Sequence, residues 1–202
     1  MRLWIEEDLP STDVGGFVVG DKDVEANLYC KSASTYDRVV IAGRPFLEAV
    51  FTYFRLDVTW SVEDGDEVDT VSHPKTVVAT VRGKCRNVLM AERTALNIFS
   101  RASGVATASR KVCDLAKTRG WKGSVAGTRK TTPGFRLVEK YALVVGGAAT
   151  HRQDLSQMVM LKDNHVKSTG SITNAVHQAR SVAGFSMKIE VCTAFSSIYR
   201  II

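Results

Sequence analysis

Short β-rich runs separated by turns fill the first 90 residues of the chain. These runs are rich in β-branched and apolar residues and cover residues 17–19, 39–42, 58–62 and 76–81. Such runs predict strands. Between the second and third runs, residues 45–54 place a proline at a first helical position and apolar residues at helical spacing, so we expect a helix that crosses the sheet. A small α+β unit is therefore predicted.

A longer helical pattern follows over residues 92–117, where apolar residues recur at intervals of three and four. Gly104 lies inside this pattern, and a glycine costs about 1 kcal/mol relative to alanine in a helix interior. We therefore expect the longest helix of the chain here, with a break or a close contact near Gly104.

After Gly120 the pattern changes to an alternation of strands and helices. The predicted strands cover residues 124–127, 143–145, 158–161 and 187–191, and the predicted helices cover residues 135–141 and 172–182. This alternation predicts a parallel α/β layer. A closed (β/α)₈ barrel needs about 250 residues, so a barrel with about four strands is incomplete. We expect two domains, residues 1–117 and residues 118–202.

The composition is that of a folded chain. Of the 202 residues, 45% are hydrophobic and 24% are charged, which excludes a disordered tail and fits one or two globular domains. There is no run of about 18 apolar residues and no opening typical of a signal peptide, so we expect a cytoplasmic protein with no membrane contact. The four cysteines form neither a CxxC pair nor a Cys/His zinc spacing, which favours idle thiols over a metal site.

Basic residues indicate a ligand-binding function because several of them follow the ends of predicted strands or turns. Lys and Arg number 27 against 21 Asp and Glu, a net charge of +6, and five cationic or protonatable groups follow predicted strands or turns: Arg129, Lys130, His151, Arg152 and Lys162. Ligands of parallel α/β folds bind at the carboxyl ends of the strands. Arginine binds carboxylates and phosphates through two hydrogen bonds, and lysine adds a point charge. The pattern predicts a pocket for a ligand with several anionic groups.

Other readings of these basic residues remain open. Most Lys and Arg side chains are solvated surface charges, and Arg136, Lys140 and Lys167 are expected to be of this kind. A nucleic-acid surface is the rival function for a basic chain, but the aromatic residues needed for stacking lie mostly outside the basic cluster.

Two further features lie beside the basic residues. Thr132 and Pro133 predict a helix start, with Thr132 as the cap, whose free N–H groups can attract an anion. Taken alone, the pattern favours an ordinary helix start over an anion site. His165, three residues after Lys162, either orients that lysine or contacts the ligand itself.

Four sequence motifs resemble those of the quinolinate phosphoribosyltransferase family, in the same order. The most specific is GTRKTTPGFRLVEKY at residues 127–141, and the others are GGAATHRQDL at 146–155, KDNH at 162–165 and ERTALN at 92–97. Weaker similarity reaches back to residues 5–9 and 43–46, so the resemblance covers nearly the whole chain.

The resemblance implies a fold and a reaction. The family fold is an N-terminal α/β sandwich, here residues 1–117 with the linking helix, followed by an α/β barrel, here an incomplete one in residues 118–202. The family converts quinolinate and phosphoribosyl pyrophosphate, which carries Mg²⁺, into nicotinate mononucleotide, CO₂ and pyrophosphate for NAD biosynthesis. Quinolinate is a dicarboxylate, which agrees with the predicted anion pocket.

The resemblance also implies roles for single residues. Arg129, His151 and Arg152 are expected to hold the quinolinate carboxylates, and Lys130 and Lys162 to add positive charge around both substrates. Glu190 is expected near the sugar and magnesium, and Lys130, Lys162 and Glu190 form the expected catalytic set. By the same resemblance Arg93 reaches into the active site of a neighbouring subunit, which implies at least a homodimer.

The sequence departs from the family pattern near its end. The family pattern resembles Lys-Ile-Glu-Val-Glu, whereas Val191 is followed here by Cys192, so the second acid is missing. We see no resemblance in residues 192–202, and the later strands with their phosphate-binding loops are absent, so we expect a truncated chain with an unrelated tail that does not turn over quinolinate. The alternative function is that of a non-catalytic isoform that associates with full-length subunits.

Overall fold

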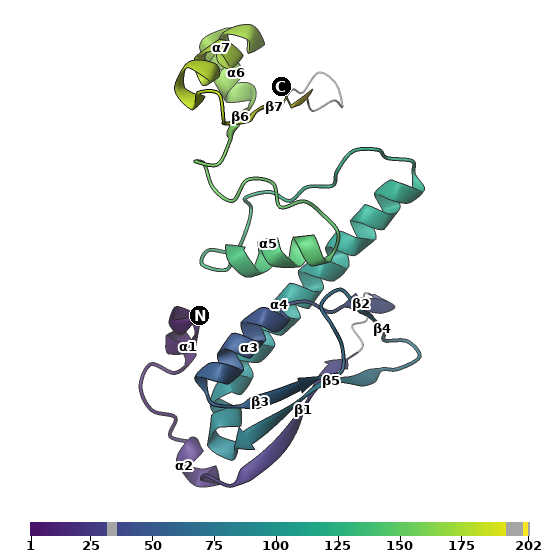
Figure 1. Cartoon of the computed structure of the whole chain (residues 1–202), viewed down its shortest axis with the longest axis vertical. Helices are drawn as coiled ribbons and strands as arrows, with labels where there is room; N and C mark the ends of the chain where they lie inside the picture. The colour runs from purple at the N-terminus through teal and green to yellow at the C-terminus, as the bar shows by residue number, and fades with distance from the viewer. Residues whose placement is uncertain (32–35, 193–199, 202) are drawn as a thin grey trace. The chain divides into compact units, whose positions relative to one another are not determined.

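The computed structural model describes residues 1–31, 36–192 and 200–201 (Figure 1). The chain folds into two compact units, Met1–Thr150 and His151–Ile202. The boundary between the two units lies after Thr150, whereas the predicted domain boundary lies after residue 117. Residues 118–150 join the first unit because residues 136–145 form a helix that packs against its long helix.

The first unit contains five helices and five strands in its described residues. In chain order they are α1 (Arg2–Asp8), α2 (Gly16–Val19), β1 (Asp23–Lys31), β2 (Arg38–Val40), α3 (Arg44–Tyr53), β3 (Asp57–Trp60), β4 (Glu67–Asp69), β5 (Lys75–Lys84), α4 (Cys85–Thr118) and α5 (Arg136–Val145). Strand β5 is central and pairs antiparallel with β1 and β3, while β2 pairs antiparallel with β4. The predicted α+β class is confirmed.

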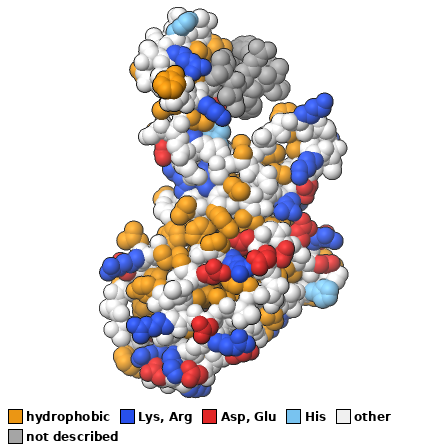
Figure 2. Space-filling view, in the orientation of Figure 1, with side chains coloured by type: hydrophobic (Ala, Val, Ile, Leu, Met, Phe, Trp, Pro, Cys, Tyr) orange, Lys and Arg blue, Asp and Glu red, His pale blue; other side chains and the backbone are white. Residues whose placement is uncertain are grey.

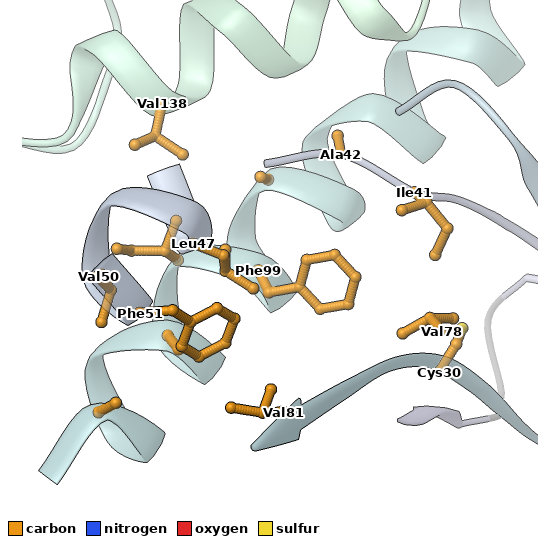
Figure 3. Packing of buried hydrophobic residues seen from close by; sticks show 14 of the residues in the cluster. Cys30, Ile41, Ala42, Leu47, Val50, Phe51, Val78, Val81, Phe99 and Val138 are labelled. Carbon is orange, nitrogen blue, oxygen red and sulfur yellow. The ribbon is translucent and has the colours of Figure 1, made fainter. Parts of the chain in front are cut away.

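The core of the first unit lies between the sheet and the helices α3 and α4. Helix α3 contributes Leu47, Val50 and Phe51, and β5 contributes Val78 and Val81 (Figure 3). These side chains are almost completely buried, and burying each of them contributes about 1.5–3 kcal/mol. The amphipathic spacing that predicts α3 therefore also identifies its buried face.

Small and hydroxylated residues of α4 let a strand approach this helix closely. The buried Thr107 hydroxyl oxygen accepts a hydrogen bond from the Val40 N–H at 2.9 Å, and the Ser103 hydroxyl oxygen accepts one from the Ala42 N–H at 3.1 Å. Buried backbone N–H groups need such partners. Helix α4 therefore packs against β2 and also accepts the hydrogen bonds of two N–H groups in and beside that strand.

In the first 90 residues the strand predicted at residues 17–19 is wrong, and strand β1 was not predicted. Residues 16–19 form the short helix α2 instead of a strand, with Phe17 and Val18 exposed. Strand β1 was missed because polar residues dominate its exposed face. Its Asp23 and Glu25 pair across the sheet with Lys84 and Arg82, both at 2.8 Å, and Figure 2 shows basic and acidic side chains interspersed over this part of the unit.

Helix α4 is continuous and longer than predicted, since it begins at Cys85 and runs for 34 residues. The expected break at Gly104 is absent. A Cβ atom at Gly104 would meet no atom within 4 Å, so neither a break nor a close contact explains the glycine.

We therefore expect Gly104→Ala to stabilise the first unit. An exposed glycine in a helix interior costs about 1 kcal/mol relative to alanine, and the open space leaves no steric penalty. Urea unfolding followed by circular dichroism should show a gain in the free energy of unfolding of about 0.5–1 kcal/mol. A loss of stability would contradict the open environment of Gly104.

The predicted strand at residues 143–145 is wrong, because these residues form the last turn of α5. Val138 and Ala142 are fully buried on this helix and Val145 packs against the same core, so the apolar run continues a helical stripe. Extended backbone appears later, where Ala149 forms a parallel bridge with Ala126. The predicted strand at residues 124–127 is reduced to this single bridge.

The second unit is a small parallel α/β arrangement. Its elements are β6 (Val159–Leu161), α6 (Asp163–Thr169), α7 (Ile172–Ala183), β7 (Ile189–Val191) and β8 (Arg200–Ile201). Strands β6 and β7 pair in parallel, as predicted, and β8 joins β7 antiparallel. A small buried cluster, in which α7 covers the strands, contains Leu161, Ala175, Ala179, Ile189 and Val191.

Two remaining expectations concern the membrane and the tail. Among the described residues, no helix is long and apolar enough to cross a bilayer, and the cytoplasmic location stays a prediction. Most of the expected unrelated tail, residues 193–199 and 202, lies outside the described residues.

Candidate functional site

The first group of predicted site residues lies in the loop that leads into α5. Arg129 is half-buried and Lys130 is exposed, and the Lys130 N–H donates to the Thr128 hydroxyl at 3.1 Å. This loop follows Ala126, whose parallel bridge to Ala149 fixes where the loop begins. The order bridge, basic loop, helix agrees with the predicted placement of Arg129 and Lys130 after a strand.

The expected helix start at Thr132 and Pro133 is wrong, because α5 begins at Arg136. The Thr132 hydroxyl donates to Oε1 of Glu139 at 2.7 Å, and its N–H donates to Oε2 at 3.1 Å. Thr132 therefore binds a buried carboxylate on α5 instead of capping the helix, and the predicted anion site at a helix N-terminus is not formed.

Glu139 also binds α4. The Nε and Nη2 atoms of Arg101 donate to Oε1 of Glu139 at 2.8 and 2.7 Å. Burial raises the pKa of Glu139, but the hydrogen bonds from Thr132 and Arg101 outweigh burial and hold the pKa below its ordinary value. Glu139 is thus a charged carboxylate that joins the basic loop to the long helix.

Lys140 corrects the prediction that it is a solvated surface charge, because it is 1% exposed. Its Nζ donates to the carbonyl oxygen of Thr150. Burial lowers the pKa of Lys140, and the positive charges of Arg136 and Arg129 lower it further. Arg136 is also not fully solvated, since it is half-buried and donates to the Thr131 hydroxyl at 3.0 Å.

Lys167, the third residue predicted to be a surface charge, is exposed on α6. For this residue the prediction is confirmed.

The second group of predicted site residues lies in the second unit, where the structure brings His151 and Glu190 together. His151 Nε2 lies 2.6 Å from a carboxylate oxygen of Glu190, and Nδ1 accepts a hydrogen bond from the Arg152 N–H at 2.8 Å. His151 has a positive φ of 55°, which is uncommon for a residue other than glycine. Both ring nitrogens are therefore engaged, and the ring orientation is set by the backbone and by Glu190.

Arg152 is 8% exposed, and its Nη1 donates to the carbonyl oxygen of Met158 at 3.0 Å. A buried guanidinium has to be compensated by partners. Because Arg presents its N–H donors in a rigid fork, the contact with Met158 orients the whole guanidinium group.

Lys162 follows β6 directly and is exposed. The Lys162 N–H donates to Nδ1 of His165 at 3.0 Å, which closes the first turn of α6. His165 thus binds the backbone of Lys162 and not its ammonium group, so both alternatives for His165 stay predictions. Glu190 lies on β7 opposite Met160 of β6. The strand ends at Val191, and Cys192, which stands in place of the expected acid, follows directly.

The remaining predicted residue, Arg93, is exposed on α4. It belongs to the first unit with Arg129 and Lys130, whereas His151, Arg152, Lys162 and Glu190 belong to the second.

Sequence analysis missed the buried pair Glu139 and Lys140, although a signal was present. Glu139 lies four residues after Phe135 and one after Val138, on the apolar stripe of α5. A charged residue on such a stripe indicates a buried, hydrogen-bonded charge instead of a solvated one.

Tyr141 makes a further contact that the sequence did not predict. Its hydroxyl donates to Oδ2 of Asp64 at 2.6 Å. Burial raises the pKa of the Tyr141 hydroxyl, and the hydrogen bond to Asp64 raises it further. Since Asp64 also accepts hydrogen bonds from the N–H groups of Gly43 and Arg44, it ties α5 to the start of α3.

Two hollows in the first unit differ from the predicted anion pocket. One of about 370 Å³ is lined by Thr94, Thr132 and Phe135 but also by Glu7 and Asp8, whose negative charge disfavours an anionic ligand. The other, of about 300 Å³, adjoins Cys113 and Trp121. Neither hollow is lined by a predicted site residue.

The predicted site residues fall into two groups, one in each unit. In the second unit, hydrogen bonds hold the His151 ring and the Arg152 guanidinium in fixed directions. Arginine, lysine and protonated histidine side chains suit carboxylate and phosphate groups. Within residues 1–31, 36–192 and 200–201, no three His, Cys, Asp or Glu side chains gather closely enough to hold a metal ion.

Comparison with known protein families agrees across both halves of the chain. The model of the quinolinate phosphoribosyl transferase N-terminal domain matches residues 11–103, and that of the C-terminal domain matches residues 105–198. The second match runs past residue 192, where we expected the resemblance to end.

Curated relatives and solved structures carry related names. Nicotinate-nucleotide pyrophosphorylase [carboxylating] of Rattus norvegicus is 47% identical over 188 residues, which cover 93% of this chain and 60% of the relative. The protein of the same name from Dictyostelium discoideum is 46% identical, with 95% of this chain and 66% of the relative covered. The crystal structure of NadC from Streptococcus pyogenes superposes with a TM-score of 0.81 at 34% identity, over 94% of this chain and 65% of that one. The chain thus spans about 60–66% of the length of these relatives.

Proposed function

Because the chain belongs to the quinolinate phosphoribosyl transferase family, we propose that it serves the transfer of a phosphoribosyl group to quinolinate in NAD biosynthesis. The substrates are quinolinate and phosphoribosyl pyrophosphate, and the products are nicotinate mononucleotide, CO₂ and pyrophosphate. This makes the chain a glycosyltransferase by family.

The observation that carries the proposal is the buried Arg152 beside the His151–Glu190 pair. Arg152 is oriented by Met158, and His151 is oriented by Glu190. A rigid, desolvated guanidinium is suited to bidentate binding of a carboxylate. Quinolinate has two carboxylates on one planar ring, so we assign one to the His151–Arg152 segment and expect Arg129 to take part in holding the pair.

The reaction needs positive charge in two places. As pyrophosphate leaves, the anomeric carbon becomes oxocarbenium-like, and preorganised cations stabilise the charge on the leaving group. We assign this role to Lys130 and Lys162, with Mg²⁺ arriving on the phosphoribosyl pyrophosphate. Glu190 supports the sugar side of the site through its carboxylate. The ring nitrogen of quinolinate bonds to the anomeric carbon as the bond to pyrophosphate breaks, which quaternises the ring. The adjacent carboxylate then leaves as CO₂, and the electron pair left on that ring carbon, stabilised by the positive nitrogen, takes up a proton from water.

Arg93 is the residue on which the proposed oligomeric state depends. It is exposed on α4, and by family resemblance it completes the site of a neighbouring subunit, which requires at least a homodimer. Sedimentation equilibrium at micromolar concentration measures this directly, and a monomer would remove the proposed role of Arg93.

Calorimetry with quinolinate and an assay of nicotinate mononucleotide formation test the proposal together. We expect the chain to bind quinolinate without forming nicotinate mononucleotide, and we expect a full-length relative to turn quinolinate over with phosphoribosyl pyrophosphate and Mg²⁺ under the same conditions. Absence of quinolinate binding would contradict the proposal. Co-purification with tagged full-length subunits by a chain that fails to bind quinolinate would favour the alternative, a non-catalytic associating isoform.

A further inference from the structure

Two adjacent charged residues of α5 are buried although neither belongs to the predicted substrate-binding set. Glu139 is 5% exposed and Lys140 is 1% exposed. Removing a charge from water costs several kcal/mol unless partners compensate it. Both residues have such partners, and these partners lie in or beside the two segments that carry the predicted quinolinate-binding residues.

Glu139 holds the segment before α5. Its two carboxylate oxygens accept the N–H and the hydroxyl of Thr132, two residues after Lys130. Arg101 binds the same carboxylate from α4 through two N–H groups. The loop with Arg129 and Lys130 is thereby anchored to α4 and α5.

Lys140 holds the segment after α5. Its Nζ donates to the carbonyl oxygen of Thr150, and this oxygen lies in the same planar peptide group as the N–H of His151. A fixed carbonyl therefore fixes the peptide plane from which His151 adopts its left-handed conformation. The direction of the His151 ring and of the Arg152 backbone depends on that plane.

We propose that Glu139 and Lys140 are positioning residues, with α5 holding Arg129 and Lys130 through the Glu139–Thr132 contacts and the His151–Arg152 segment through the Lys140–Thr150 contact. The identity of the ligand rests on the proposed function, whereas the anchoring itself rests on the contacts alone. The backbone of each segment would thus be held before quinolinate binds, which lowers the ordering cost of binding to that segment.

Hydrogen exchange with mass spectrometry on the whole chain tests the anchoring without any ligand. In Glu139→Gln, a glutamine side chain offers one acceptor oxygen instead of two, so we expect the amides of residues 129–134 to exchange at least about tenfold faster. In Lys140→Met we expect the same change at residues 149–152. Matched controls are Glu25→Gln, which breaks an exposed ion pair on β1, and Lys122→Met, which removes an exposed lysine.

Quinolinate calorimetry on the same variants tests the positioning role. We expect Glu139→Gln to weaken binding at least about tenfold, and to cause no further loss when Arg129→Ala is already present, because coupled residues are not additive. A role in stability alone would weaken binding equally in both backgrounds. Thr132→Val, which removes only a hydroxyl, repeats the test in case Glu139→Gln does not fold.

The outcomes separate the two claims. Faster exchange confined to the expected segments, with a non-additive loss of affinity, supports positioning. Unchanged exchange at residues 129–134 and 149–152 overturns it, as does unchanged affinity in variants of a chain that binds quinolinate. If the unaltered chain binds no quinolinate, the proposed ligand is removed and the exchange data alone decide whether α5 anchors the two segments.

Discussion

Arg152→Ala is expected to weaken quinolinate binding strongly. The guanidinium is almost completely buried and oriented by the Met158 carbonyl oxygen, so its loss removes a desolvated, charged contact. Truncating one partner of such a pair costs about 2–5 kcal/mol. Since each 1.4 kcal/mol is about tenfold in affinity, the dissociation constant should rise at least about 30-fold in titration calorimetry.

The matched control for this variant is Arg180→Ala. Arg180 lies in the same unit but is exposed on α7, so its removal changes the net charge equally without touching the proposed ligand contacts. We expect affinity within about twofold of the unaltered chain, because an exposed charge contributes little at moderate salt. Equal losses for both variants would show that quinolinate responds only to overall charge.

Arg152→Lys refines the same prediction. Lysine keeps the charge but lacks the planar fork that can contact Met158 and a carboxylate at once. Affinity between those of the unaltered chain and Arg152→Ala is expected. Full affinity would mean that a point charge suffices and that the bidentate geometry is unnecessary.

The sequence predicted well the features that follow from periodicity or from specific motifs. Helix α3 was predicted from a proline and helical spacing, and the parallel pair β6 and β7 from short apolar runs. The position of Arg129 after a strand-like segment also followed from pattern, whereas the strand predicted before His151 and Arg152 is the last turn of α5. The features predicted correctly share one property: the local sequence alone decides them.

The errors arose where distant contacts decide the structure. Strand β1 was missed because its exposed face carries acidic residues. These are neutralised only by Lys84 and Arg82, which lie more than 50 positions away in sequence. Lys140 looks like a surface residue because its partner, the Thr150 carbonyl oxygen, is a backbone atom without a sequence signature. The start of α5 was misplaced because Thr132 binds Glu139, a contact that competes with helix capping.

Gly146→Ala, at the C-cap of α5, is expected to lower the stability of the first unit. A Cβ atom at residue 146 would lie 2.4 Å from the carbonyl oxygen of Ala106 and 2.5 Å from Cβ of Ser109. Neither atom is the end of a flexible side chain, so α5 would have to move away from α4. Overpacking of this kind costs about 1–3 kcal/mol.

The backbone of Gly146 makes this prediction specific. Its φ of −73° and ψ of −6° suit any residue, so alanine causes no local strain and the whole penalty comes from the contact between helices. The same movement would lengthen the hydrogen bond from the Ser109 hydroxyl to the Leu143 carbonyl oxygen, now 3.0 Å, and that from Arg110 to the Gly146 carbonyl oxygen.

Urea unfolding of Gly146→Ala beside Gly104→Ala makes the measurement decisive. Both variants add one methyl group to a glycine of the same helical pair, yet we expect opposite signs, because one methyl enters open space and the other enters backbone. Movement of α5 should also loosen the segments that Glu139 and Lys140 anchor, so faster exchange at residues 129–134 is expected in Gly146→Ala only. Equal stability of the two variants would mean that α5 does not pack on α4 as closely as the contact at Gly146 requires.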